Sequence, residues 1–268
     1  MVDKSEKFNW AVRAGYFSRA ILYAMLGIIA LTSAQAISEG TNGVFRAVED
    51  FPAGTAILWI MVIGLTGYAL FRFASLIFDI ENNGSDAKGW GKRIGHAGSG
   101  AGHLALAYSA YAYASSSGSG GSGGGAQQAA SGVLSADFGG LVIGVLGLIF
   151  FIVALVQINK AISGKFMRRI SGSAPSFTRT LGGAGFAARG VVYGIIAWSL
   201  VRAGFMSGSS GDIRTLGDAL ATLAGEGVAF TVTAIGLLMF GVFSLILARY
   251  RIIPELDADQ GVPEFRTA

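Results

Sequence analysis

The chain has 268 residues, of which 52% are hydrophobic and only 13% are charged, and its mean hydropathy is +0.57. Soluble domains carry about 25% charged residues, so this composition indicates a membrane protein. The absence of cysteine excludes disulfides, thiolate nucleophiles and thiolate metal sites. The formal net charge of +4 comes from basic residues spread over several loops without an aromatic stacking platform, which argues against nucleic-acid binding.

Six segments are long and apolar enough to cross a bilayer as helices, which takes about 20 residues each. None shows the alternation of polar and apolar residues that a membrane barrel requires. The sequence therefore predicts an all-α polytopic membrane protein with six transmembrane helices. The expected spans are residues 13–36, 54–78, 94–115, 138–159, 181–204 and 227–248.

The first segment has a second interpretation. Basic residues precede its apolar run, which ends in Ala34-Gln35-Ala36, and this pattern is typical of a cleaved signal peptide. However, a matching segment begins near Gly185, deep in the chain, where no signal peptide can lie. An uncleaved first helix is therefore the favoured interpretation.

A short pattern recurs three times and opens the first, third and fifth segments. It spans residues 15–23 and 185–193, with a more divergent copy at 98–106. The second helix of each pair carries its own glycine theme, which begins at Gly64, Gly144 and Gly236. The sequence therefore predicts three tandem two-helix hairpins in a pseudo-threefold arrangement, within one membrane domain covering residues 1–253. The expected repeats are about 8–82, 92–165 and 179–253.

Lysine and arginine indicate the orientation of the spans, because cytoplasmic loops carry an excess of them. All but three of the 20 basic residues lie at the termini, in the 79–93 and 160–180 loops, or at the helix ends beside them. The exceptions are Arg46, Arg202 and Arg214. Both termini are therefore expected in the cytoplasm.

The outer loops and the C-terminal tail differ in composition. The loop 115–137 holds a Gly/Ser tract and is expected to be a flexible coil, because it lacks the lysine and the strand–helix setting of a phosphate-binding loop. Residues 44–48 and 213–220 are short amphipathic pieces. Each is either a helix with its apolar side toward lipid or, as the favoured interpretation, a re-entry segment that aims the next helix. The tail 254–268 is expected to be cytoplasmic and disordered, with a docking peptide as the alternative.

The candidate binding residues are arginines and tyrosines. Arg19 and Arg189 each precede a tyrosine by four residues, Tyr23 and Tyr193, so each pair lies on one helix face. Arg72 could join them from the cytoplasmic third of the second helix. A guanidinium beside a phenol suits a carboxylate, a phosphate or a lipid headgroup. The alternative is that the arginines only anchor helix ends by extending to water.

The other polar residues offer weaker chemistry. His96 and His103 lie seven residues apart on one helix face, so they cannot ligate one haem from both sides; they are candidates for polar packing or for carrying a proton. Asp79 and Glu81 are interpreted as solvated charges at a helix end. No catalytic motif is visible, and the sequence predicts no enzyme, no metal and no cofactor. Two GxxxG pairs, Gly140 with Gly144 and Gly190 with Gly194, are predicted to mark close helix contacts.

The recurring residues Gly-x-x-x-Arg-Ala/Gly-x-x-Tyr at 15–23 and 185–193, with Gly64-Leu65-Thr66-Gly67-Tyr68-Ala69-Leu70-Phe71-Arg72, resemble the DUF1206 family of bacterial membrane proteins. The resemblance covers nearly the whole chain. It implies a six-helix protein of the bacterial inner membrane and implies no activity. The middle copy departs from the pattern, with Gly102 in place of the arginine and Leu106 in place of the tyrosine.

The sequence favours a non-enzymatic accessory or scaffold subunit, or a lipid-contacting protein, of the inner membrane. Its expected partners are membrane lipids and a larger membrane complex or further copies of the chain. The alternative is a channel or transporter that binds an anion or anionic lipid through Arg19, Arg72 and Arg189.

Overall fold

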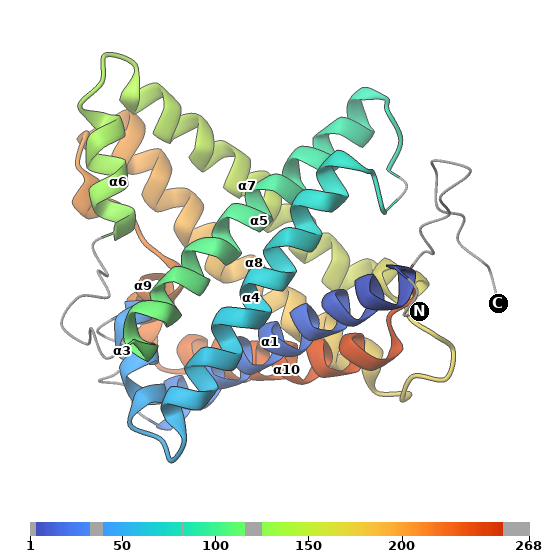
Figure 1. Ribbon diagram of the computed structural model, residues 1–268. Coiled ribbons are helices and arrows are strands. Elements are labelled where there is room, and N and C mark those ends of the chain that lie inside the picture. Colours follow the sequence, from blue (N-terminus) through green and yellow to red (C-terminus); the bar gives the residue numbers. More distant parts are fainter. Residues whose placement is uncertain (1–3, 33–39, 82, 116–124, 254–268) are drawn as a thin grey trace.

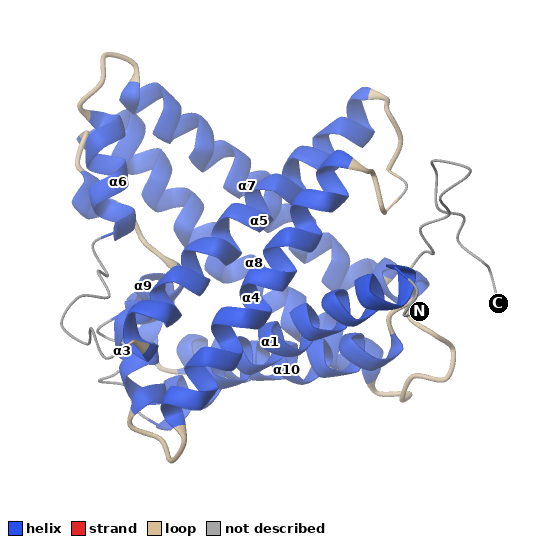
Figure 2. Cartoon of the chain, viewed as in Figure 1, coloured by secondary structure: helices blue, strands red, loops and turns tan. Residues whose placement is uncertain are grey.

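The computed structural model describes residues 4–32, 40–81, 83–115 and 125–253, and within these ranges the chain forms helices and no strand (Figure 2). The long helices are α1 (Lys4–Thr32), α4 (Gly54–Ile77), α5 (Ala87–Ala114), α7 (Gly139–Ser163), α8 (Thr178–Arg202) and α10 (Val228–Tyr250). The shorter helices are α3 (Gly40–Glu49), α6 (Gly125–Leu134) and α9 (Leu216–Leu223). Single turns of 3-10 or π-helix occupy Lys165–Arg169, Ala203–Ser207, Ser210–Asp212 and Ala224–Glu226. The predicted all-helical class is confirmed.

Five of the described helices are long and apolar enough to cross a membrane, namely Val12–Thr32, Gly54–Ile77, Gly139–Ser163, Thr178–Ser207 and Val228–Tyr250. The chain is therefore a membrane protein. The remaining predicted span, 94–115, corresponds to α5, which is 28 residues long but is diluted by six glycines and two histidines. It begins at Ala87, seven residues before the predicted start at position 94.

The long helices pack as three antiparallel pairs (Figure 1). α4 lies along α5, α7 along α8, and α1 along α10. Two further contacts join these pairs, since α1 also packs on α4 and α8 on α10, whereas α5 and α7 scarcely touch. The start of α1 and the end of α10 lie at one end of the bundle, and α3, α6 and α9 lie at the other (Figure 1).

Glycines set how closely the helices of each repeat approach. A Cβ atom added at Gly15 of α1 would lie 2.8 Å from Cβ of Tyr68 on α4, and one added at Gly185 of α8 would lie 2.6 Å from Cβ of Phe240 on α10. Only glycine allows this spacing. At Gly98, the matching position of α5, an added Cβ would meet nothing within 4 Å. The first and third hairpins are thus closed, and the middle one is open.

The short outer helices cover one end of the bundle. Phe45 and Val48 of α3 and Leu220 of α9 are fully buried, and α3 packs against α9. The apolar sides of both segments therefore face the protein, as in the re-entry interpretation, and not the lipid. Most of the Gly/Ser tract (116–124) and the tail 254–268 lie outside the described residues.

We expect alanine at the three equivalent glycines to have opposite effects. Gly15→Ala and Gly185→Ala force two helices apart and should destabilise the protein by about 1–3 kcal/mol. Gly98→Ala adds a methyl group in open space and should be neutral or stabilising by up to about 1 kcal/mol, because alanine favours a helix over glycine. Unfolding of the purified variants in detergent measures this, and an equal loss in all three would contradict the open middle hairpin.

Candidate functional site

Arg19 lies inside the bundle and is only 6% exposed. Its Nε donates to Oγ of Ser244 at 3.2 Å, and its Nη1 donates to the hydroxyl of Tyr68 at 2.9 Å. The guanidinium also stacks over the rings of Tyr16 and Phe240, at 4.7 and 5.0 Å from their centres. No carboxylate of the described residues lies within 4 Å of it. Rings and hydroxyls stabilise this charge, and no acid neutralises it.

Arg189 repeats this arrangement in the third hairpin and is 9% exposed. Its Nη2 donates to the hydroxyl of Tyr193, four residues later on α8. Its guanidinium lies over the rings of Phe240 at 4.5 Å and of Tyr23 at 5.4 Å. Its Nε is buried and has no hydrogen-bond partner. A buried donor of this kind is costly, and in a membrane protein it marks a candidate binding group.

Tyr68 connects the first arginine to a second one. Tyr68 is 1% exposed, and its hydroxyl accepts from Arg19 and from Nε of Arg72 at 3.0 Å. Arg72 lies one helical turn further along α4, toward its C-terminal end. One phenol oxygen therefore links guanidinium groups from α1 and α4.

Glu81 is the centre of a second cluster, beyond the end of α4. Its carboxylate accepts from Arg72 at 3.2 Å, from Arg251 at 2.9 Å and from Arg169, and the His96 ring lies 3.6 Å away. Burial raises the pKa of the Glu81 carboxyl, but the three arginines outweigh that effect and hold its pKa well below the usual range. The interpretation of Glu81 as a solvated charge was wrong, since this residue is 6% exposed.

Local backbone structure brings these partners to Glu81. Asp79 has a left-handed backbone (φ 46°), and its carboxylate accepts from the backbone N–H groups of Asn83 and Gly84 at 2.8 and 2.7 Å. This turn points the chain back toward the bundle. On the other side, N–H of Ile252 donates to the carbonyl of Arg169, which holds the 165–171 segment beside the end of α10. The cluster thus ties α4, α10 and the α7–α8 connection together.

The two histidines lie in different surroundings. Nδ1 of His96 lies 3.0 Å from Nη1 of Arg72, in the Glu81 cluster. Nδ1 of His103 lies 2.7 Å from the carbonyl of Ser99, and its ring packs on Tyr68 with centres 4.6 Å apart. Among the described residues, no group of three His, Cys, Asp or Glu side chains could hold a metal ion.

Lys160, near the end of α7, is a basic group that the sequence analysis did not single out. Its Nζ lies 5.5 Å from the centre of the Phe186 ring on α8, and its side chain is exposed. Its position three residues after Gln157, a buried polar group of the same helix, could have pointed to it.

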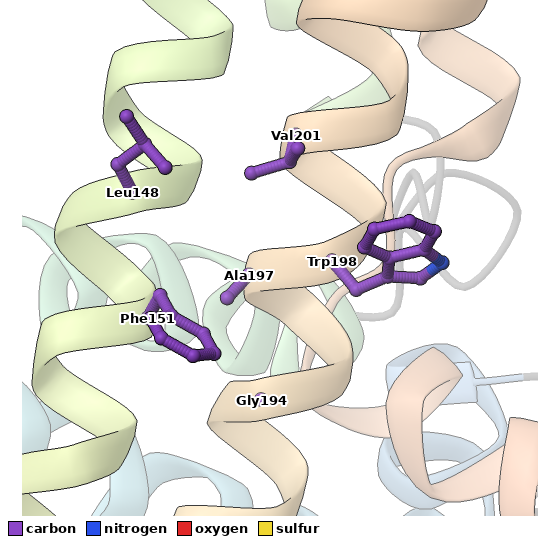
Figure 3. A pocket seen from close by; sticks show the side chains of 6 residues that line it. All are labelled: Leu148, Phe151, Gly194, Ala197, Trp198 and Val201. Carbon is purple, nitrogen blue, oxygen red and sulfur yellow. The ribbon is translucent and has the colours of Figure 1, made fainter.

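The glycine pairs divide between contact and open space. Gly140 and Gly144 approach the π-helical turn after α8, at Gly204 and Phe205, and Gly190 meets Ile158 of α7. An added Cβ at Gly194 would meet nothing within 4 Å. Gly194 instead lines an apolar groove of about 230 Å³ between α7 and α8. The other lining residues are Leu148, Phe151, Ala197, Trp198 and Val201 (Figure 3).

The charges of the two clusters do not balance. Arg19, Arg72, Arg169, Arg189 and Arg251 supply five guanidinium groups, and Glu81 supplies the carboxylate that three of them contact. Arginine stays protonated in proteins, so these six side chains by themselves carry a formal excess of four positive charges. The sites of these charges are suited to holding an anion.

Comparison with known proteins bears on the identity of the chain. The family model described as Domain of Unknown Function (DUF1206) matches it three times, at residues 14–75, 94–164 and 184–251. The chain belongs to this family. The matches coincide with the three predicted repeats and confirm the resemblance. The chain is also 28% identical to Uncharacterized protein YxxB of Bacillus subtilis (strain 168) over 249 residues, which cover 89% of the chain and 90% of that protein. No solved structure matches it.

Replacing Glu81 should destabilise the end of this DUF1206 protein at which its α1 begins and its α10 ends. Glu81→Gln leaves three guanidinium groups without their carboxylate, and breaking a buried ion pair costs about 3–5 kcal/mol. The folded pKa of Glu81 is lowered, so its contribution is present above the unfolded pKa of about 4.3 and is lost as the pH falls toward the folded pKa. Unfolding of the wild type should therefore become easier below about pH 5, and this acid-dependent part should be smaller in the variant. The exposed Glu226→Gln serves as the control, and an equal acid response in all three proteins would contradict the assignment.

Proposed function

We propose that the chain is a six-span protein of the bacterial inner membrane, with both termini in the cytoplasm and its hairpins in a pseudo-threefold arrangement. The packing order supports this, because the second helix of each repeat lies along the first helix of the next: α4 along α5, α7 along α8, and α10 along α1. α5 is long enough to span, and it packs along α4, which itself has the length and apolarity of a spanning helix.

Cysteine labelling tests this topology, because the wild type contains no cysteine. The variant Lys88→Cys places a cysteine just inside the start of α5, and the variant Ser135→Cys places one between α6 and α7. In intact cells, a membrane-impermeant maleimide should label position 135 and leave position 88 unlabelled until the membrane is opened. Labelling of both positions at equal rates would mean that α5 does not span.

The function that the geometry supports best is binding of an anion within the membrane by a non-enzymatic protein. The ligand class is a phosphate or carboxylate group, carried by a lipid or free. The observation that supports it is the excess of buried guanidinium charge, with Arg19 and Arg189 held by rings and hydroxyls and with Nε of Arg189 left free. Uncompensated charge is expensive in the membrane, and a bound anion would supply the missing counter-charge.

Thermal unfolding in a neutral detergent tests the anion site. Inorganic phosphate should stabilise the wild type, by about 2.7 kcal/mol when its concentration is 100 times the dissociation constant. Arg189→Gln should reduce this stabilisation, since a hydrogen bond to a charged group contributes about 1.5–3 kcal/mol. Arg202→Gln is the matched control, because the exposed Arg202 lies outside the site and pairs with Asp212. Equal stabilisation of both variants by phosphate would reject the assignment.

A role as an accessory or scaffold subunit is the second candidate. The helix α7 favours it, because only 28% of its most apolar stretch is buried, against 61% for α1 and α10. Such a surface fits either lipid or a neighbouring membrane protein. Native mass spectrometry on protein gently extracted from its own membrane distinguishes a lipid-covered α7 from one covered by a partner, since a subunit retains a protein partner in fixed stoichiometry.

A further inference from the structure

Two buried side-chain atoms of the described residues have no hydrogen-bond partner, and they come from neighbouring helices. One is Nε of Arg189 on α8, and the other is Oε1 of Gln157 on α7. The two residues are only 9% and 6% exposed. A buried donor or acceptor that stays unpaired is costly, so such atoms mark a place where a further group binds. The proposed function accounts for the Arg189 donor but not for the Gln157 acceptor.

Backbone contacts between α7 and α8 place the two residues at the same level. These helices run antiparallel (Figure 1). A Cβ added at Gly190 would lie 3.4 Å from the carbonyl oxygen of Ala154 and 2.5 Å from Cδ1 of Ile158. Gly190 is the chain neighbour of Arg189, and Gln157 lies between the other two residues in the sequence. Arg189 and Gln157 are therefore opposite each other along the helix pair.

A ring contact places both side chains on the same side of this helix pair. The Phe150 ring of α7 meets the Tyr193 ring of α8, with centres 6.0 Å apart. Phe150 precedes Gln157 by seven residues, which is about two helical turns. Tyr193 follows Arg189 by four residues and accepts a hydrogen bond from it. Each ring therefore shares a helix face with one of the two polar residues.

A second contact lies on the other side of the two polar residues. Nζ of Lys160 on α7 lies 5.5 Å from the centre of the Phe186 ring on α8. Lys160 follows Gln157 by three residues, and Phe186 precedes Arg189 by three. The two polar residues thus lie between two contacts that join the same faces of α7 and α8. No hydrogen bond joins Gln157 Oε1 to Arg189 Nε, so an acceptor and a donor converge on one part of the interior with room for a group between them.

The surroundings of these two atoms define the group that can join them. No carboxylate of the described residues lies within 4 Å of Arg189, and its guanidinium lies over the rings of Phe240 and Tyr23. The group must therefore bring negative charge to Arg189 and a hydrogen-bond donor to Gln157. An anion without a proton meets only the first need, because its oxygens can accept hydrogen bonds but cannot donate one.

We propose that Arg189 and Gln157 select an oxyanion that retains a proton, namely a hydrogen phosphate group, which accepts from Nε of Arg189 and donates its O–H to Oε1 of Gln157. This rests on the proposed anion site and names its ligand. At neutral pH inorganic phosphate retains at least one proton, and a phosphate monoester retains one on part of its molecules. Sulfate, carboxylates and phosphodiester lipids retain none. Gln157 is thus a specificity-determining residue of the site.

Matched anions test this selectivity through thermal unfolding in a neutral detergent at pH 7. Inorganic phosphate is compared with sulfate, and phosphatidic acid with phosphatidylglycerol, since only the first member of each pair offers a proton on its anionic group. The wild type should bind phosphate or phosphatidic acid at least about tenfold more tightly than its partner, which corresponds to about 1.4 kcal/mol. Charge alone would not give this order, because sulfate carries at least as much negative charge as phosphate. The pair that shows the preference tells whether the ligand is free or carried by a lipid.

Gln157→Met removes the acceptor at nearly the same side-chain volume, so it should abolish the preference while sulfate still binds. Asn159→Leu is the matched control, because Asn159 is an exposed amide two residues further along α7, and this variant should keep the preference. Equal binding of both members of each pair by the wild type would overturn the proposal and leave the anion site standing. A preference that survives in Gln157→Met would overturn it too. If none of the four ligands stabilises the wild type, the anion site fails as well.

Discussion

Burial of permanently charged guanidinium groups is the constraint on which this bundle depends. Arginine cannot lose its proton in a protein, so each buried arginine needs acceptors and polarisable surfaces around it. Arg19 and Arg189 meet this need through the same residue, because the Phe240 ring of α10 lies 5.0 Å from one guanidinium and 4.5 Å from the other. The ring can serve both only if α1, α8 and α10 approach closely. Glycine at positions 27, 185 and 241 permits that approach.

The loss of the arginine and the opening of the hairpin occur in the same repeat. In the first and third copies, the first helix supplies an arginine to the interior and closes on its own second helix. In the middle copy, Gly102 replaces the arginine, and α5 keeps its contact with α4 but not with α7. His103, one position further, reaches the interior there, where it packs on Tyr68. The three repeats therefore do not form three equal sites.

The helical hairpins could be predicted from the sequence because a recurring pattern fixes them independently of tertiary contacts. The Arg–Tyr spacing predicted that each pair shares one helix face, and in the third repeat Arg189 donates a hydrogen bond to Tyr193 of the same helix. In the first repeat, Arg19 donates to Tyr68 of α4, and the Tyr23 ring lies beside Arg189. Spacing along a helix identifies a shared face, but it does not identify the neighbouring helix that fills that face.

Glu81 shows why its cluster of arginines could not be predicted. By sequence it is an acid just after an apolar helix, which is ordinarily solvated. Its burial depends on Arg169 and Arg251, which are 88 and 170 residues away, and on the left-handed turn at Asp79. The residues near Glu81 in the sequence do not indicate these partners. The open state of the middle repeat was equally hidden, because Gly98 keeps the pattern that closes the other two hairpins and only the packing of α5 and α7 distinguishes it.

The arrangement of charge has a consequence for how an anion would act on this protein. The Glu81 carboxylate is already shared by three arginines at the closed end, so it cannot also neutralise Arg19 and Arg189, which lie deeper among the rings. Under the proposed function, the bound phosphate neutralises the buried arginines of the interior, as the Glu81 carboxylate neutralises arginines at the end of the bundle. Such a ligand would stabilise the fold as well as occupy a site, because the free energy of binding adds to that of folding. Because this chain carries buried arginines without a carboxylate contact among the described residues at two of three equivalent positions, the proposed function predicts that it takes its counter-charge from a bound anion.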